Sequence, residues 1–290
     1  MNNNYDFNWK HKIIDLLTSK NKDSIINSFN IKDTYIPNSL FRYRIYNDKY
    51  VKKEIINQEV YASIPSAFND PYDSNYRNIN KNILKDKEFI KHINNIKKNS
   101  NISDYDMDNF WNIFLSYMAE ESSKSIRNNL RVSCFSAQEN GNFPINFPMW
   151  YHYADKYRGI CIEYDMTKFN KNDLQRLFTF PIIYKNFKYN FLDIKCIDNA
   201  YLYNFLISIY KDESWSYENE WRFISAFDYI DNNNLSSNHI NKYNKFYIKS
   251  IYIGYRASKK LIKKILYLSK NRYEVYIMDV SDLGIIFHKY

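Results

Sequence analysis

Apolar side chains recur along this chain at helical or alternating spacing, and that spacing predicts the order of its elements. An N-terminal helix is predicted over residues 8–30, before Pro37. Alternating or short apolar runs predict strands at 40–45, 59–63, 131–136, 160–164, 180–184, 220–225, 246–254 and 273–280, with a closing strand at 283–287. Helical spacing predicts helices at 51–56, 79–97, 104–126, 150–157, 196–210 and 258–268.

This mixture predicts an α+β fold, with a mixed, mostly antiparallel central β-structure and helices before, between and after its strands. The chain shows no internal repeat and no long linker, so we expect a single domain over residues 1–290. Within it, residues 1–36 are expected to form a helical lead-in and residues 40–290 the α+β core. A helical insertion at about 79–126 interrupts that core.

Composition limits the class of protein and the cellular location that we expect. The 290 residues are 45% hydrophobic, which is enough for a large core, and no apolar run reaches membrane-spanning length. The N-terminus has no signal-peptide pattern and the three cysteines form no CxxC pair, so we expect a cytoplasmic protein with reduced thiols. The five histidines are scattered, and we expect no metal cofactor.

The net charge of +9 admits nucleic acid as a partner, although a lysine- and asparagine-rich coding bias would explain the same charge without one. Under such a bias the few glycines become informative, because they occur where another residue would not serve. Gly159 and Gly254 flank predicted strands, where we expect backbone with positive φ.

Two carboxylates lie at the start of one predicted strand. Glu218 lies on a polar loop, and Glu220 opens a strand whose alternation places Glu220 and Arg222 on one face and aromatic residues on the other. A carboxylate at the mouth of a buried strand, with a second one two positions earlier, resembles a catalytic arrangement. The same residues could instead form an ordinary ion pair at a strand end.

Polar groups also gather near the ends of two other strands. Arg42 and Arg44 share one face of the first strand, and Ser133 and Ser136 lie on the strand at 131–136. The loop at 63–73 holds two prolines and the turn signature Asn-Asp-Pro at 69–71, so we expect it to be ordered. Its acidic groups are expected to pair with one of the two arginines.

These segments together resemble a bacterial family of unknown function, DUF2971. The resemblance rests on five segments in the family's order: Phe-Arg-Tyr-Arg at 41–44, Tyr-Ala-Ser-Ile-Pro-Ser-Ala-Phe-Asn-Asp-Pro-Tyr-Asp at 61–73, Ser-Cys-Phe-Ser at 133–136, Met-Trp-Tyr-His-Tyr-Ala-Asp-Lys-Tyr-Arg-Gly-Ile-Cys-Ile-Glu-Tyr-Asp at 149–165, and Tyr-Glu-Asn-Glu-Trp-Arg at 217–222. It spans roughly residues 40–280 and excludes the helical N-terminal segment and the insertion.

The order of these motifs is also similar to that of the ADP-ribosyltransferase superfamily. There a first strand supplies His or Arg, a middle strand supplies Ser or Tyr, and a late strand begins with the catalytic Glu. Many DUF2971 members have His on the first strand, where this chain has Arg42. The resemblance therefore favours the Arg-Ser-Glu form of the site and implies NAD as the substrate.

The chemistry of such a site assigns a role to each residue. Cleavage of the nicotinamide–ribose bond passes through an oxocarbenium-like state, which Glu220 would stabilise. Arg42 would hold a pyrophosphate or ribose oxygen, and Ser136, or less so Ser133, would orient either group. Glu218 would act as general base on the acceptor. Further contacts with NAD are expected from Tyr43, Asn69, Asp70, Trp150 and Tyr153.

We therefore expect ADP-ribosyl transfer from NAD to a macromolecule, or NAD hydrolysis, in a toxin or phage-defence setting that the family resemblance implies. One alternative is a non-catalytic module that senses a nucleotide or nucleic acid through three arginines, Arg42, Arg158 and Arg222. Another is a metal-dependent nuclease built on four carboxylates, Asp70, Asp73, Glu163 and Glu218, although no tight acidic spacing supports it. The NAD enzyme requires Arg42, Ser136 and Glu220 to meet in one cleft.

Overall fold

The structure is a computed structural model that describes residues 3–19, 21–75, 124, 127–128, 130–138, 143–185, 200–227, 243–282 and 284–290. The predicted helices at 79–97 and 104–126 fall almost wholly outside the described residues, as does the first part of the helix predicted at 196–210. Within the described part, none of the helices is long and apolar enough to cross a membrane.

An eight-stranded sheet forms the centre of the molecule, in the order β12-β11-β10-β4-β1-β3-β8-β5. Neighbouring strands are antiparallel except for β10 and β11. The strands are β1 (Ser39–Arg44), β3 (Leu130–Ser136), β4 (Ile160–Asp165), β5 (Thr179–Pro181), β8 (Glu220–Phe227), β10 (Ile248–Ile253), β11 (Glu274–Ser281) and β12 (Gly284–Lys289). The predicted α+β class with a mostly antiparallel sheet is confirmed.

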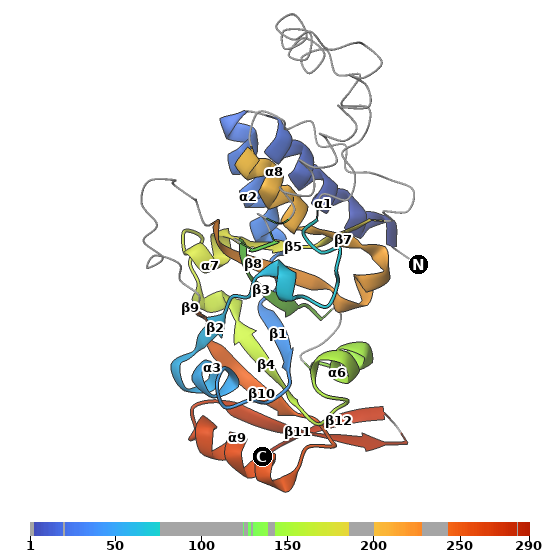
Figure 1. The fold of residues 1–290 in the computed structure, drawn as a ribbon, viewed down its shortest axis with the longest axis vertical. Helices are drawn as coiled ribbons and strands as arrows, with labels where there is room; N and C mark the ends of the chain where they lie inside the picture. The colour runs from blue at the N-terminus through green and yellow to red at the C-terminus, as the bar shows by residue number, and fades with distance from the viewer. Residues whose placement is uncertain are drawn as a thin grey trace, which may run out of the picture.

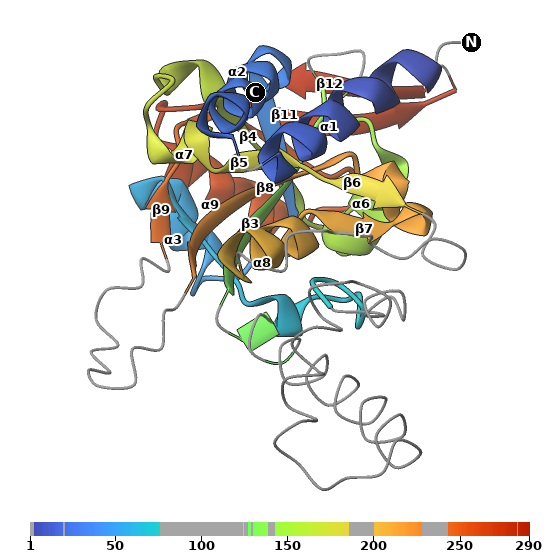
Figure 2. The same cartoon turned by 90° about the horizontal axis from the view of Figure 1, so that it is seen from above.

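Two pairs of short strands flank this sheet. The antiparallel pair is β2 (Glu59–Tyr61) with β9 (Tyr243–Lys245), and the parallel pair is β6 (Ile183–Lys185) with β7 (Tyr210–Asp212). The described residues also form the helices α3 (Val51–Asn57), α6 (Phe147–Tyr153), α7 (Leu174–Leu177), α8 (Ala200–Ser208) and α9 (Lys259–Ser269), and the 3-10 turns η1 (Pro65–Ala67), η3 (Met166–Lys168) and η4 (Glu213–Glu218). Figure 1 shows α9 at one end of the molecule and α8 near the other, and Figure 2 shows the same elements from above.

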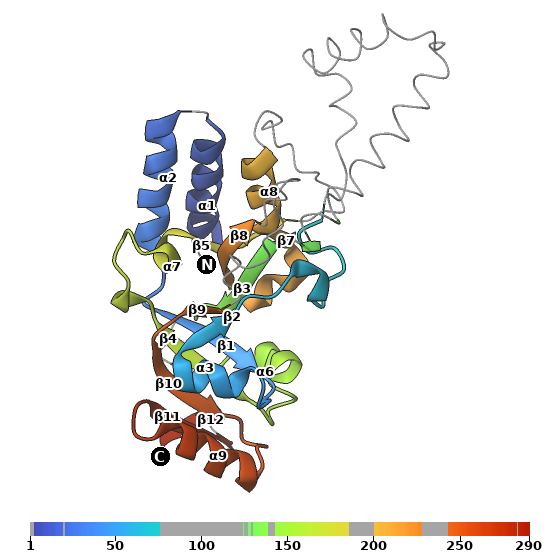
Figure 3. The same ribbon diagram turned by 60° about the vertical axis from the view of Figure 1, so that its left-hand side comes forward.

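The N-terminal segment forms two helices, so the prediction of a single helix over residues 8–30 is wrong. Helix α1 (Asn3–Thr18) and helix α2 (Lys22–Tyr35) lie side by side as a hairpin (Figure 3). Asn21 breaks the helical run because its side chain accepts a hydrogen bond from the Asp23 N–H at 2.9 Å and thereby caps α2. The Trp9 ring stacks on Tyr35 with centroids 4.2 Å apart, which joins the two helices.

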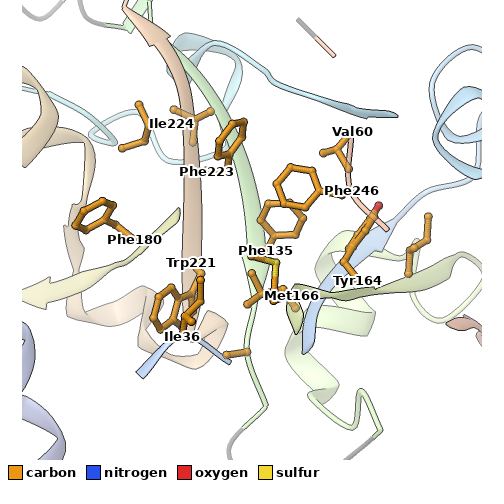
Figure 4. Close-up of a cluster of buried hydrophobic side chains, with 14 of the residues drawn as sticks. Ile36, Val60, Phe135, Tyr164, Met166, Phe180, Trp221, Phe223, Ile224 and Phe246 are labelled. Atoms are coloured by element: carbon orange, nitrogen blue, oxygen red, sulfur yellow. The ribbon is translucent and has the colours of Figure 1, made fainter. Parts of the chain in front are cut away.

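A cluster of aromatic rings holds the centre of the sheet together (Figure 4). Phe246, which lies between β9 and β10, contacts the rings of Phe135, Tyr164 and Phe223 at centroid distances of 4.9, 5.9 and 5.4 Å. All four residues are buried. The predicted alternation in β8 is confirmed, because Trp221 and Phe223 pack in this core and Glu220 and Arg222 lie on the opposite face.

The sheet opens where β1 meets β3. The only paired residues of these two strands are Phe41 and Ser136, whereas β1 pairs with β4 along its whole length. The residues that follow Phe41 in β1 therefore separate from the residues that precede Ser136 in β3. The chain after β2 enters this gap, and Ser63 forms a bridge with Val132. This divergence makes room for a cavity inside an otherwise continuous sheet.

Gly159 and Gly254 are needed for close packing, and the prediction of positive φ at these positions is wrong. The left-handed residues nearby are Asp155, Lys156 and Tyr157, with φ values of 48°, 52° and 68°. A Cβ on Gly159 would lie 2.3 Å from the Arg44 carbonyl oxygen, and one on Gly254 would lie 2.1 Å from the Tyr157 carbonyl oxygen. Glycine therefore allows the turn after α6 to lie against β1 and β10.

Gly254→Ala should destabilise the protein by roughly 1–3 kcal/mol, because the new methyl group collides with backbone that cannot move aside like a side chain. Urea unfolding followed by circular dichroism measures this change. Lys263→Ala, at an exposed position on α9, is the control and should change stability by less than about 0.5 kcal/mol. Equal stability of the Gly254 variant and the wild type would contradict the close-packing role.

Candidate functional site

A cavity of about 450 Å³ occupies the gap between β1 and β3. Its wall is completed by the start of β8, by Lys211 of β7, by α6 and by the loop that follows η1. Arg42, Ser136 and Glu220 all line it, although each comes from a different strand. The pairing of Ser136 with both Phe41 and Glu220 brings the three strands together at this point.

Glu220 lies at the centre of a buried ion network. Its Oε1 accepts a hydrogen bond from Arg222 Nε at 2.7 Å, and its Oε2 accepts from Lys211 Nζ at 3.0 Å and from Arg222 Nη2 at 3.2 Å. The side chain of Glu220 is only 4% exposed. Burial would raise its pKa, but the two cations outweigh burial and hold the pKa well below its usual range. Glu220 is therefore ionised at neutral pH.

Arg222 anchors this network and has no solvent exposure at all. Its Nη1 donates to Asp73 Oδ1 at 2.8 Å and to the Ser208 carbonyl at 2.7 Å, and its Nη2 donates to Asp73 Oδ2 at 2.5 Å. The guanidinium therefore forms a two-pronged bond with Asp73 while it also holds Glu220. This arrangement ties the loop at 69–73 to strand β8.

Glu218 is the second buried carboxylate, and its environment differs from that of Glu220. Tyr153 donates to its Oε1 at 2.5 Å, and Lys211 donates to its Oε2. Burial, together with the neighbouring negative charge of Glu220, raises the pKa of Glu218 to about 7, although Lys211 acts in the opposite direction. Two adjacent carboxylates thus differ in protonation, which is the arrangement expected of an acid/base pair.

The backbone around Glu218 is held by the end of β3. Ser136 donates its hydroxyl to the Glu218 carbonyl oxygen at 2.6 Å, and the Ala137 N–H donates to the Asn219 carbonyl at 2.9 Å. Asn219 has a left-handed φ of 43°, which turns the chain sharply between η4 and β8. Ser136 therefore positions the segment that carries the two carboxylates. Glu218 itself ends a 3-10 turn, where the sequence predicted a loop.

Lys211 joins the two carboxylates, and sequence reasoning missed it. It is the middle residue of the short strand β7, so its side chain points opposite to those of Tyr210 and Asp212. Its ammonium group bonds both Glu218 and Glu220 and lies 4.8 Å from the centre of the Trp215 ring. The alternation of side chains along a strand indicates that Lys211 points away from Tyr210 and Asp212. Nothing in the sequence identifies Glu218 and Glu220 as its partners.

Arg42 is committed to a buried partner that the sequence did not identify. Its Nη1 donates to Glu54 Oε1 at 3.1 Å, and the Tyr164 hydroxyl donates to the same carboxylate oxygen. Helical spacing puts Glu54 on the buried face of α3 with Val51 and Ile55, and an acidic residue on an apolar face was the signal that could have found it.

Arg44 lines the same cavity with its guanidinium largely uncommitted. Its Nε lies 3.6 Å from Glu54 Oε2, which is too long for a hydrogen bond, and both of these atoms are buried without a hydrogen-bond partner among the described residues. Its side chain is 23% exposed. Burial lowers the pKa of Arg44, and the attraction to Glu54 offsets only part of that effect. An anion entering the cavity would satisfy this cation.

The loop at 69–73 lies at the cavity, but its expected pairing with Arg42 or Arg44 is wrong. Asn69 and Asp70 line the cavity, and Asp70 Oδ1 accepts from the Tyr72 N–H at 2.9 Å, so the Asp70 side chain stabilises its own turn. Arg42 instead bonds Glu54, Arg44 lies 3.6 Å from the same carboxylate without a hydrogen bond, and Asp73 binds Arg222.

The predicted nucleotide contacts divide into two groups. Tyr43 and Tyr153 line the cavity together with Asn69 and Asp70, whereas Ser133 and Trp150 do not. Ser133 is fully buried and bonds the Tyr61 carbonyl at 3.4 Å. Trp150 packs in a second core cluster and donates its indole N–H to the Pro144 carbonyl at 2.5 Å.

The two alternative clusters predicted from the sequence do not assemble. Arg158 is exposed and pairs with Asp155 at 3.0 Å, so it does not join Arg42 and Arg222. Glu163 lies outside the cavity lining and accepts from Ser39, Lys249 and Tyr252, each at 2.7 Å. Among the described residues, no group of three or more His, Cys, Asp or Glu side chains could hold a metal ion.

The fold and site together define an α+β protein with a paired-carboxylate cavity inside a split sheet. Residues 149–223 match the family model described as "Protein of unknown function (DUF2971)", so the predicted resemblance to this family is confirmed over that span. The matched segment includes Tyr153, Lys211 and the stretch from Glu218 to Arg222. No curated protein and no solved structure matches the chain.

Glu218 should make the stability of the fold depend on pH. Its pKa is raised from 4.5 to about 7 on folding, so the folded state binds this proton more tightly than the unfolded state. Stability from this group is therefore fully present below about pH 4.5 and is lost as pH rises to about 7, by up to roughly 3 kcal/mol. The pKa of Glu220 is lowered on folding, so the stability from this group is lost as pH falls, and only at lower pH.

Urea unfolding from about pH 5 to about pH 8 measures this effect when the wild type is compared with Glu218→Gln. The glutamine removes the titrating group, and the other groups of the protein cancel in the comparison. The wild type should lose stability relative to the variant as pH rises. A difference that stays constant with pH would show that Glu218 titrates normally.

Proposed function

We propose that the cavity binds NAD and cleaves its nicotinamide–ribose bond, and that ADP-ribose passes to a macromolecular acceptor or to water. The observation that carries this proposal is the pair Glu218 and Glu220, two buried neighbours in one cavity with oppositely shifted pKa values. The strand order of Arg42, Ser136 and Glu220 supports an ADP-ribosyltransferase-like arrangement. The proposed setting, a toxin or phage-defence effector, rests on the family resemblance.

Bond cleavage places positive charge on the ribose, and Glu220 is the group suited to stabilise it. Its Oε1 accepts from one nitrogen and its Oε2 from two, so Oε1 retains acceptor capacity for a ribose hydroxyl. Arg222 and Lys211 keep Glu220 ionised and fix its position, although their charge offsets part of its field. This rigidity means that little reorganisation is needed as the charge develops.

Glu218 is suited to exchange a proton with the acceptor. A carboxylate with a pKa near 7 is poised for proton transfer at neutral pH, and Tyr153 and Lys211 hold its two oxygens. Loss of a proton from the acceptor hydroxyl or amine to Glu218 would leave a neutral carboxylic acid. Burial favours that neutral form.

The phosphates of NAD would meet Arg44. Arg42 was the predicted ligand, but its guanidinium already bonds Glu54, whereas Arg44 keeps its donors available at the cavity wall. A planar guanidinium matches two phosphate oxygens at once. In this proposal Arg42 orients Glu54, and Arg44 takes the pyrophosphate.

A non-catalytic nucleotide-binding module is the second candidate function. It is favoured by the full pairing of the carboxylates, because Arg222 and Lys211 would make the same ion network in a purely structural role. Both candidates predict nucleotide binding in the cavity. Turnover of NAD separates them.

Glu220→Gln should lower nicotinamide release from NAD by about a hundredfold to a thousandfold, because the amide keeps the size of the side chain but removes its charge. Glu218→Gln should instead lower transfer to the acceptor and leave release of free ADP-ribose largely intact. Mass spectrometry of nicotinamide, ADP-ribose and modified acceptors measures both reactions.

Glu274→Gln is the matched control, since Glu274 is an exposed carboxylate on β11. Thermal melts of all three variants confirm that each is folded at the assay temperature. Full NAD turnover by Glu220→Gln would overturn the catalytic assignment. Absence of any turnover in the wild type, combined with nucleotide binding, would favour the non-catalytic module.

Arg44→Met should weaken the binding of ADP by roughly tenfold to a hundredfold and leave the binding of adenosine unchanged, because only ADP offers phosphate oxygens to the guanidinium. Isothermal titration calorimetry with both ligands measures this difference. Arg158→Met, which removes an exposed arginine outside the cavity, is the control. An equal loss of affinity for ADP and for adenosine would show that the substitution changes the shape of the cavity rather than removing a phosphate contact.

A further inference from the structure

The positive charge of the chain is concentrated in two short segments. Residues 47–57 contain three lysines and two acidic residues, and residues 255–273 contain seven basic residues and no acidic one. These 30 residues therefore carry +8 (10 − 2) of the net +9, which leaves +1 for the other 260. A general lysine bias would spread the excess along the chain, so the bias does not explain this distribution.

The two segments meet in space. The first contains α3 and the second contains α9, and these helices pack against each other. Arg272 fastens them, because its Nη1 donates to the Ile56 carbonyl at 3.0 Å and its Nη2 donates to the Leu268 carbonyl at 2.9 Å. Figures 1 and 3 show α9 at the end of the molecule away from α1 and α2.

Helix α9 separates its charges from its apolar residues. At about 100° per residue, its lysines and Tyr267 fall within roughly 140° of arc. Ile265 and Leu268 lie on the opposite side and are buried. The α3–α9 basic face consists of Lys49, Lys52, Lys53, Arg256, Lys259, Lys260, Lys263, Lys264, Lys270 and Arg272. All of them are exposed except Lys264, which is half-buried.

Little negative charge opposes this face. Glu54 of α3 points inward and is 1% exposed, where it binds Arg42. Asp48 pairs with Lys264 at 2.5 Å. The other cations of the face are exposed at neighbouring positions on and beside two packed helices. Their mutual repulsion would be relieved when a polyanion binds.

We propose that the α3–α9 basic face binds the phosphate backbone of double-stranded nucleic acid without sequence preference. Lysine ammonium groups act as point charges that contact phosphates and carry no base information. A single-stranded ligand would require uncovered aromatic rings on which its bases could stack. The rings of Tyr255, Tyr267 and Tyr273 on this face each lie beneath one of its cations instead.

A membrane surface fits the same face less well. A helix that lies on lipid buries its apolar side in the bilayer, and the apolar side of α9 is already buried against the protein core. The proposal is independent of the chemistry in the cavity, because it concerns a different surface and is tested by binding alone.

The test uses fluorescence anisotropy of the full chain with a mixed-sequence DNA duplex of about 25 base pairs. An RNA duplex of the same sequence, the single strands, and vesicles containing phosphatidylserine serve as comparison ligands. Lys259→Glu/Lys260→Glu/Lys263→Glu reverses three charges on the face. Lys22→Glu/Lys168→Glu/Lys171→Glu makes the same change in net charge at exposed positions elsewhere.

We expect the wild type to bind the duplex, and the logarithm of its binding constant should fall linearly with the logarithm of the salt concentration. The face variant should bind at least tenfold more weakly at about 0.1 M salt, and its salt slope should fall by about 0.9 for each phosphate that the variant no longer neutralises. The control variant should stay within about threefold of the wild type. Binding of both DNA and RNA duplexes supports recognition of the backbone, and binding of one alone identifies the form recognised.

Three outcomes would overturn the proposal. The first is no duplex binding by the wild type at about 0.05 M salt. The second is an equal decrease in affinity in the face and control variants, which would show an effect of net charge alone. The third is tighter binding to single strands or to vesicles than to the duplex.

Discussion

The buried guanidinium of Arg222 is the constraint on which the candidate site depends. A charge removed from water is costly unless ionic partners and hydrogen bonds surround it, and Arg222 finds them in Asp73, Glu220 and the Ser208 carbonyl. Asp73 lies on a loop 149 residues away in the sequence and Ser208 ends α8 14 residues away, whereas Glu220 belongs to the same strand as Arg222. Satisfying one arginine therefore fixes the relative positions of three elements around the cavity.

The same network separates the protonation of the two neighbouring glutamates. Glu220 bonds both Arg222 and Lys211 and stays ionised, whereas Glu218 bonds one cation and a tyrosine hydroxyl. Lys211, which bonds both glutamates, cannot fully neutralise the two carboxylates. Placing two acidic groups close together in a buried site thus costs stability, and the cost is reduced when Glu218 holds a proton. Such a cost is common where buried charges serve function.

The split between β1 and β3 supplies space for this network, and a second ion cluster lines its other wall. Arg42 and Arg44 both face Glu54, so two cations share one carboxylate. The result is an excess of positive charge on the β1 side of the cavity, opposite Glu218 at the end of η4 and Glu220 at the start of β8. A bound molecule with an anionic group and a sugar would match both sides.

The sequence by itself determined the local features of this protein. Alternation predicted most strands of the central sheet and the two faces of β8, because side-chain direction in a strand follows from sequence position alone. The sequence also indicated Arg42, Ser136 and Glu220 as candidate site residues on three different strands, and the structure brings all three to one cavity. The break between α1 and α2 escaped prediction because the Asn21 cap competes with continuous helical spacing.

Only the tertiary structure decided which charges pair. Lys211, Glu54 and Asp73 obtained their partners through contacts between segments far apart in the chain or on different elements, and the spacing of residues does not encode these contacts. The glycines show the same limit, since Gly254 is required by a carbonyl nearly 100 residues away, at Tyr157, rather than by its own φ angle. Pairing and close approach depend on the packed fold, whereas alternation depends on the local backbone alone.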